Sequence, residues 1–123
     1  MQSNKPKFRD MVEKRVYSFA LNVIAFVDQL SKGQVSYVIG EQLIRSATSI
    51  GANVVESQGA ASRKDYTNFF SHALKSANET KFWLGLLRDS GKADKASADE
   101  LRKETAELAK ILATSILSLK GRG

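Results

Sequence analysis

The sequence predicts an all-α fold, an antiparallel up-down-up-down four-helix bundle in one domain that spans residues 1–123. Three observations lead to this prediction. Apolar residues recur at alternating spacings of four and three, which is typical of helices with one buried face. Only one proline and eight glycines interrupt the chain, so long regular elements with few connections are expected. No segment shows the apolar–polar alternation of a half-buried strand.

The first helix is predicted over residues 10–31, after a flexible basic arm at residues 1–9 that holds the only proline, Pro6. Its apolar stripe is unbroken and consists of Val12, Val16, Phe19, Val23, Phe26 and Leu30. Further apolar surface beside the stripe comes from Tyr17, Leu21, Ile24 and Val27. A helix that is apolar on more than one face is either deeply buried or shared with another subunit.

The second helix is predicted over residues 36–58, with Gly33 ending the first helix and Ser36 as N-cap. Its most distinctive part is the stretch from Leu43 to Ser57. The apolar stripe there is flanked by small residues that let another helix approach closely, namely Ser46, Ser49, Gly51 and Ala52.

The third and fourth helices are predicted over residues 62–90 and 97–120. Both begin with a serine followed three residues later by an acidic residue, Ser62 with Asp65 and Ser97 with Glu100, which is the form of a capping signal. Because the connections are short, neighbouring helices are expected to alternate in direction.

Four polar residues stand close to the predicted contact between the second and third helices: Arg45, Asn53, Glu56 and Glu79. Antiparallel pairing about the turn at residues 59–61 places Arg45 level with residue 75, one turn from Glu79. We interpret the four as a structural polar network that fixes helix register, because buried charges require partners. A ligand site is the alternative.

The residues needed for common catalytic or metal chemistry are missing from the sequence. There is no cysteine and only one histidine, His72, with no Glu-x-x-His motif of the kind that binds paired metals in bundles. The glycines do not form a phosphate-binding loop. We therefore expect no enzymatic activity, no metal and no cofactor. No apolar run reaches the length of a membrane span and the N-terminus lacks a secretory signal, so we expect a cytoplasmic protein.

The charge of the chain suggests an anionic partner, most plausibly RNA or DNA. The net charge is +6 and the isoelectric point is about 9.7. In the predicted topology one end of the bundle collects seven cations against the acids Asp10, Glu56 and Asp65. These predicted nucleic-acid-binding residues are Lys5, Lys7, Arg9, Arg63, Lys64, Lys120 and Arg122. A solvated charged end without a ligand is the alternative.

The stretch from Gln42 to Gly91 resembles the four-helix-bundle family called S23, or 23S rRNA intervening-sequence proteins. The matching features are Gln42-Leu43-x-Arg45-x-Ala47-x-Ser49-Ile50, Asn53-Val54-Val55-Glu56, Asp65-Tyr66-x-x-Phe69, and Ala73, Ser76 and Glu79. Ser57 departs from the pattern, since the family usually has glycine there. The resemblance implies a ring-like homopentamer without established enzymatic activity. It also implies kinship with the accessory variability protein of diversity-generating retroelements, which binds nucleic acid and a reverse transcriptase.

The sequence thus favours a non-enzymatic homo-oligomer that binds RNA or DNA through its basic end, as an adaptor for a nucleic-acid enzyme such as a reverse transcriptase. The alternative is a structural or protein-interaction module that forms a ring without touching nucleic acid. A small-molecule site in the bundle or at its subunit contacts is a third alternative.

Overall fold

Four long helices make up the computed structural model, which describes the backbone of residues 5–121 and the side chains of residues 8–121. They are α1 (Lys5–Asp28), α2 (Gln34–Glu56), α3 (Arg63–Asp89) and α4 (Lys95–Gly121), with a single turn of 3₁₀ helix, η1 (Ser57–Gly59), after α2. The described residues contain no strand. The all-α, four-helix prediction is therefore confirmed.

The first helix begins earlier and ends earlier than predicted. It starts at Lys5, so residues 5–9 of the expected flexible arm are helical. Pro6 is compatible with this start because the first-turn N–H groups of a helix have no intrahelical acceptor, and proline lacks only such a group. Residues 1–4 of that arm lie outside the described residues.

Two predicted caps are wrong. Gly33, with a φ of 148°, is the N-cap of α2, whereas Ser36 lies inside that helix and is buried. At the start of α4 the cap is Asp94, because its Oδ2 accepts bonds from both the backbone N and the Oγ of Ser97, each at 2.9 Å. A carboxylate one turn earlier competes effectively with a serine for the free N–H groups of a helix start. Ser62 does cap α3, as predicted.

The core is a single cluster to which all four helices contribute. The largest completely buried apolar side chains come from each predicted stripe, for example Phe19, Leu43, Leu84 and Leu108. The apolar stripes are less buried toward the ends of the bundle, where Leu30, Tyr66 and Leu119 are only partly buried. Each predicted stripe is thus the core face of its helix.

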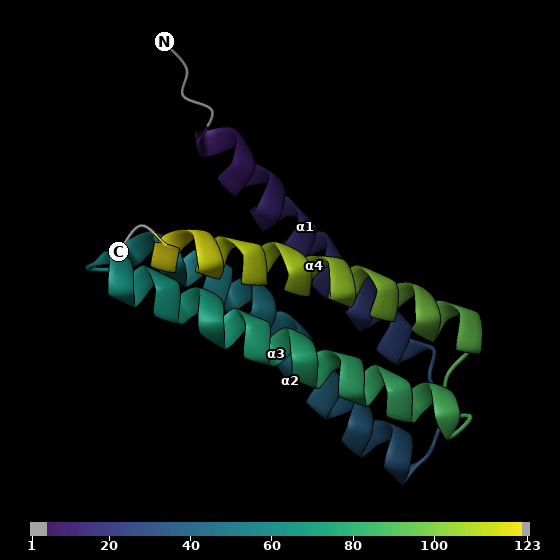
Figure 1. Ribbon diagram of the computed structural model, residues 1–123. Coiled ribbons are helices and arrows are strands. Elements are labelled where there is room, and N and C mark those ends of the chain that lie inside the picture. Colours follow the sequence, from purple (N-terminus) through teal and green to yellow (C-terminus); the bar gives the residue numbers. More distant parts are fainter. Residues whose placement is uncertain (1–4, 122–123) are drawn as a thin grey trace.

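Consecutive helices run in opposite directions (Figure 1). On α2 and α3, Ser46 contacts Thr80 while Ser49 contacts Ser76, so one residue number rises as the other falls. Packing is close between α2 and α3 and between α3 and α4, but α1 contacts α4 only sparsely. The α1–α4 side is consequently open, and a groove of about 1100 Å³ lies along it.

Two glycines of α2 lie against α1. A Cβ atom at Gly51 would meet Val16 Cγ2 at 3.5 Å, which is an ordinary contact distance. A Cβ atom at Gly40 would lie 3.2 Å from Val27 Cγ1 and 3.3 Å from Leu30 Cδ1, which is crowded. Only Gly40 therefore brings α1 closer than an alanine would comfortably allow.

These distances predict opposite consequences for two alanine substitutions. Gly51→Ala should raise the free energy of unfolding by about 0.5–1 kcal/mol, because alanine loses less backbone entropy than glycine within a helix. Gly40→Ala should give a smaller gain or a loss, since Val27 and Leu30 must shift. Urea denaturation of the two variants measures both effects, and equal stabilisation would contradict the crowding at Gly40.

Candidate nucleic-acid interface

The start of α1, the α2–α3 connection and the end of α4 lie toward the same end of the bundle, which we call the basic end, although the first turns of α1 stand away from the other two segments (Figure 1). A shallow hollow of about 430 Å³ joins them there. Arg9 of α1, Arg63 of α3 and Leu119 of α4 line it together with the connection between α2 and α3. Three segments far apart in the sequence thus share one surface.

Local hydrogen bonds fix the start of α3 within this surface. Ser62 Oγ accepts from the backbone N of Asp65 at 3.0 Å, and Asp65 Oδ2 accepts from the backbone N of Ala61 at 3.1 Å. This reciprocal capping holds the first turn of α3, where Arg63 and Lys64 are exposed. Arg9 approaches from α1, with its Nη1 3.4 Å from Gln58 Oε1 of η1.

The structure brings four of the seven predicted cations to the basic end. Arg9, Arg63, Lys64 and Lys120 are exposed there. Lys5 and Lys7 belong to the first turns of α1, but their side chains lie outside the described part of the chain, as does all of Arg122.

At the opposite end of the bundle two cations, Arg88 and Lys95, are paired with neighbouring acids, whereas Lys32 and Lys92 form no ion pair within the described residues. Arg88 bonds Asp89 Oδ1 and Asp99 Oδ1, each at 2.8 Å, and Lys95 bonds Asp99 Oδ2 at 2.9 Å. The pKa of Asp99 is lowered by the hydrogen bonds from Arg88 and Lys95. At the basic end, no ion pair within the described residues involves Arg9, Lys64 or Lys120.

The predicted polar network is present only in part, and it lies on the surface. Arg45 and Glu79 form an ion pair between α2 and α3, and Glu79 also accepts from Trp83 Nε1 at 2.9 Å. The Arg45 side chain is 57% exposed, so the expectation of charges buried in the interior is wrong. The register of the two helices also differs from the predicted one, because Arg45 lies level with Glu79 rather than with residue 75.

Asn53 and Glu56 do not join this pair. The Nδ2 of Asn53 donates to the carbonyl and the Oγ of Ser49 within α2, at 2.9 and 3.1 Å. The side chain of Glu56 is exposed and makes no hydrogen bond or ion pair within the described part of the chain. The four residues therefore do not form one network.

Two hydroxyl pairs that the sequence interpretation missed connect α2 with α3. Thr80 Oγ1 donates to Ser46 Oγ and Ser76 Oγ donates to Ser49 Oγ, both at 2.9 Å. Ser46 and Thr80 are completely buried. The sequence does show serine and threonine at core-facing positions on both helices. Assigning them to pairs would have required the correct register between α2 and α3.

Neither a metal-binding cluster nor a membrane-spanning helix is found among the described residues. The described histidine, aspartate and glutamate side chains form no cluster of three or more that is suited to a metal ion, and His72 is exposed. Within residues 5–121, none of the helices has the length and apolar content required to cross a bilayer.

The fold and the basic end define a small helical-bundle protein with one cationic end, and comparison with known proteins gives its family. Residues 10–114 match the sequence profile of the 23S rRNA-intervening sequence proteins. The chain belongs to this family. The resemblance found in the central helices therefore extends over most of the chain.

A solved structure from the same family has the same fold. It is a protein of unknown function from the S23 ribosomal protein family of Bacteroides thetaiotaomicron, 33% identical in sequence, with a TM-score of 0.82. The match covers 88% of this chain and 96% of that one. The chain has no significant match among curated proteins.

The surface position of the Arg45–Glu79 pair predicts that its loss is tolerated better than the loss of a buried hydroxyl. Glu79→Gln should lower the free energy of unfolding by at most about 0.5 kcal/mol, because solvent screens exposed ion pairs. Thr80→Val should lower it by about 1 kcal/mol, because the buried bonds of the Thr80 hydroxyl to Ser46 Oγ and to the Ser76 carbonyl are both lost. Urea denaturation compares the two, and a larger loss for Glu79→Gln would show that the ion pair matters more than its exposure implies.

Proposed function

We propose that this protein is a non-enzymatic, homo-oligomeric, cytoplasmic helical bundle that binds RNA or DNA through its basic end and serves as an adaptor for a nucleic-acid enzyme such as a reverse transcriptase. The polarity of the charge carries the proposal. Arg9 and Arg63 line one shallow hollow, and Lys64 and Lys120 are exposed near the same end of the bundle. The cations Arg88 and Lys95 of the opposite end are held by acids.

Binding at the basic end is expected to depend on phosphates rather than on bases. Lysine and arginine side chains neutralise phosphate charge and release counterions, which gives affinity without sequence readout. The aromatic side chains near this end offer little for stacking, because Tyr66 is half-buried against Phe70 with ring centroids 5.0 Å apart. Phe8 is exposed there, at 50%. The proposed interaction is therefore weakly selective and sensitive to salt.

Self-association is supported by the outward face of α1. Tyr17, Leu21 and Ile24 follow one another at helical spacing and are 68%, 51% and 43% exposed. A stripe of large apolar side chains on one helix is typical of a surface that another chain covers. The homopentamer implied by the resemblance remains a prediction. A ring of five chains would repeat the +6 charge around its axis and strengthen the field at the basic ends.

The alternative function is a structural or protein-interaction ring that does not bind nucleic acid. The same exposed stripe of α1 supports it, because this surface fits a protein partner and requires no phosphate. The two functions differ in whether the cations of the basic end affect binding to a polyanion.

A charge-reversal pair tests nucleic-acid binding. Arg63→Glu/Lys64→Glu should weaken binding of a labelled single-stranded RNA or DNA by at least about tenfold, and should reduce the salt slope of the affinity by about 1.4–1.8 for two lost phosphate contacts. The control Lys103→Glu/Lys110→Glu makes the same charge change on exposed positions of α4 away from the basic end. Fluorescence anisotropy across a salt series gives both quantities.

Equal losses in the two double variants would mean that net charge alone drives the interaction and that the basic end is not a site. Unchanged retention of Arg63→Glu/Lys64→Glu on heparin would favour the alternative function. An affinity that does not fall between low and moderate salt would exclude phosphate-driven binding.

Oligomerisation has its own test. Light scattering should give a mass five times that of the 13.5 kDa chain. Leu21→Glu should reduce this mass, because it places a carboxylate in the exposed stripe of α1. Leu117→Glu on α4 is the matched control, since Leu117 is also a largely exposed leucine, at 72%. If the wild-type protein is a monomer, or if both variants have the same mass in light scattering, the stripe of α1 is not the contact between copies of the chain.

A further inference from the structure

The side of α3 that faces away from the core carries a row of exposed side chains, which we call the outward face of α3. Separations of four, seven, three and four residues place them on one side of the helix: Lys64, Asn68, Lys75, Asn78 and Phe82. No hydrogen bond or ion pair within the described residues involves the polar side chains of this row. The row therefore offers two ammonium groups and two amides to a ligand.

The acids of α3 are already bound to other groups. Asp65 Oδ2 accepts from the backbone N of Ala61 at 3.1 Å, and Glu79 pairs with an arginine of α2. Asp89 bonds Arg88 at 2.8 Å. None of these acids belongs to the row itself, so the outward face of α3 is cationic between Lys64 and Phe82.

Phe82 ends the row with an exposed aromatic ring. Its side chain is 58% exposed, and it meets the half-buried Trp83 edge to face, with ring centroids 5.1 Å apart and an angle of 68° between the rings. An exposed ring next to cations is the combination with which proteins stack the bases of single-stranded nucleic acids.

A guanidinium from α4 lies next to this part of α3. Arg102 Nε donates to the carbonyl of Lys81 at 3.3 Å, and a Cβ atom at Gly85 would lie 3.9 Å from Arg102 Nη2. Neither Nη group has a hydrogen-bond or ion-pair partner within the described part of the chain. Arg102 thus has donors left for a phosphate one turn or less from Phe82.

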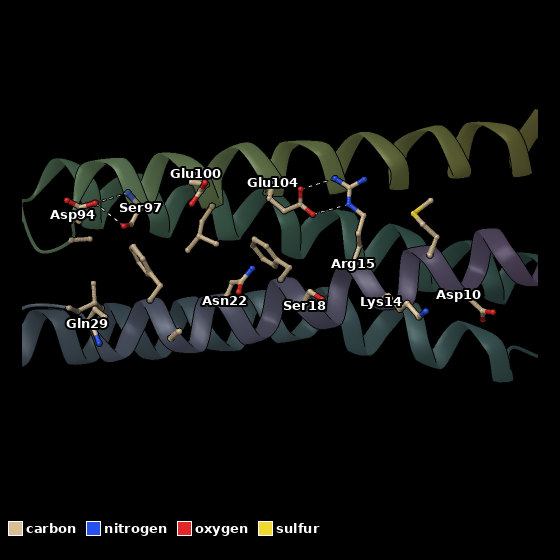
Figure 2. Close-up of a pocket in the computed structure, with 17 residues that line it drawn as sticks. Asp10, Lys14, Arg15, Ser18, Asn22, Gln29, Asp94, Ser97, Glu100 and Glu104 are labelled. Atoms are coloured by element: carbon tan, nitrogen blue, oxygen red, sulfur yellow. Dashed lines mark hydrogen bonds and ion pairs between the residues drawn. The ribbon is translucent and has the colours of Figure 1, made fainter.

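The other long surface of the bundle is unsuited to a polyanion. Four carboxylates line the α1–α4 groove against two cations, Lys14 and Arg15, and the bonds of Arg15 with Glu104 span it at 2.8 and 3.0 Å (Figure 2). Lys64, by contrast, belongs both to the basic end and to the outward face of α3. A strand that is bound at the basic end can therefore continue along α3 to Phe82, over roughly 27 Å at 1.5 Å per residue.

We propose that the outward face of α3 binds a single-stranded segment of RNA or DNA, with phosphates at Lys64, Lys75 and Arg102 and one base stacked on Phe82. A duplex cannot bind in this way, because its bases are already stacked on one another. The inference rests on the proposed nucleic-acid binding at the basic end and adds the class of nucleic acid. Stacking on a ring accepts any base, so little sequence selectivity is expected.

Substitutions of the ring test the stacking. Phe82→Ala should weaken binding of a labelled single-stranded oligonucleotide by at least about fivefold. The salt slope of the affinity should stay the same, because the ring carries no charge. Phe82→Tyr keeps the stacking surface and should bind like the wild type. Tyr37→Ala removes a ring of α2 that is 69% exposed and is the matched control. Fluorescence anisotropy across a salt series measures all four proteins, and far-UV circular dichroism verifies their helices.

Two further measurements locate the strand. Trp83 is the only tryptophan of the chain and contacts Phe82, so its emission should change on binding with the same midpoint as the anisotropy. Arg102→Gln should reduce the salt slope for the single strand by about 0.7, the value for one phosphate contact. The neighbouring exposed Lys103, replaced in Lys103→Gln, is the control and should leave the slope unchanged.

Equal affinities of Phe82→Ala and Tyr37→Ala would overturn the inference and leave Phe82 to a protein partner. An equal loss of single-strand and duplex binding in Phe82→Ala would also overturn it, because stacking is limited to the single strand. If Arg63→Glu/Lys64→Glu weakens binding and Phe82→Ala does not, only this inference fails. If Arg63→Glu/Lys64→Glu binds like its own control, the basic end fails, and a wild type that binds no single strand overturns both.

Discussion

The close contact between α2 and α3 is the constraint on which the rest of the structure depends. It is built from small residues and from hydroxyls that bond across the seam, Ser46 with Thr80 and Ser49 with Ser76. Ala47, Ala73 and Ala77 are completely buried beside them. Two helices that approach this closely leave little freedom in register, because their small residues fit together at few relative levels. The cross-seam bonds add to this, although Ser46 and Thr80 each also bond a carbonyl of their own helix. The seam therefore sets the level at which Arg45 meets Glu79.

The positions of the basic end and of the α1–α4 groove follow from this seam. The turn that closes it carries Arg63 and Lys64, and so places the basic end at the end of α2 and the start of α3. On the other side of the bundle, α4 packs closely against α3, while α1 packs against α2 at Gly40 and Gly51. Contact is weaker between α1 and α2 and sparse between α1 and α4, and the α1–α4 groove lies along this last contact. The basic end and the groove are thus produced by the same packing.

The sequence was sufficient to predict the helices and their buried faces, because a 4-3 spacing of apolar residues directly reports which side of a helix is buried. It also indicated that the cations at the start of α3 and at the end of α4 lie at the same end of the bundle. This prediction needs only the alternating directions of the helices. It failed at Ser36 and Ser97, since the choice among nearby capping residues depends on the path of the loop. The exposure of Arg45 was missed because spacing along one helix does not tell how far its neighbour covers it. The groove was not predicted. It depends on how α1 and α4 are placed relative to each other, and local sequence patterns do not encode the placement of two helices that are distant in the chain.

The sparse contact between α1 and α4 also bears on how the chain folds. The contacts of α2 with α3 and of α3 with α4 join neighbouring segments, so each can form after closing only a short loop. Contact between α1 and α4, by contrast, joins the two ends of the chain and is reinforced across the groove mainly by the Arg15–Glu104 pair. Because α1 has the weakest packing against the other helices, we expect it to be the first helix to separate from the bundle. Amide hydrogens of α1 should then be the first of the four helices to exchange with solvent, because local opening follows the weakest packing.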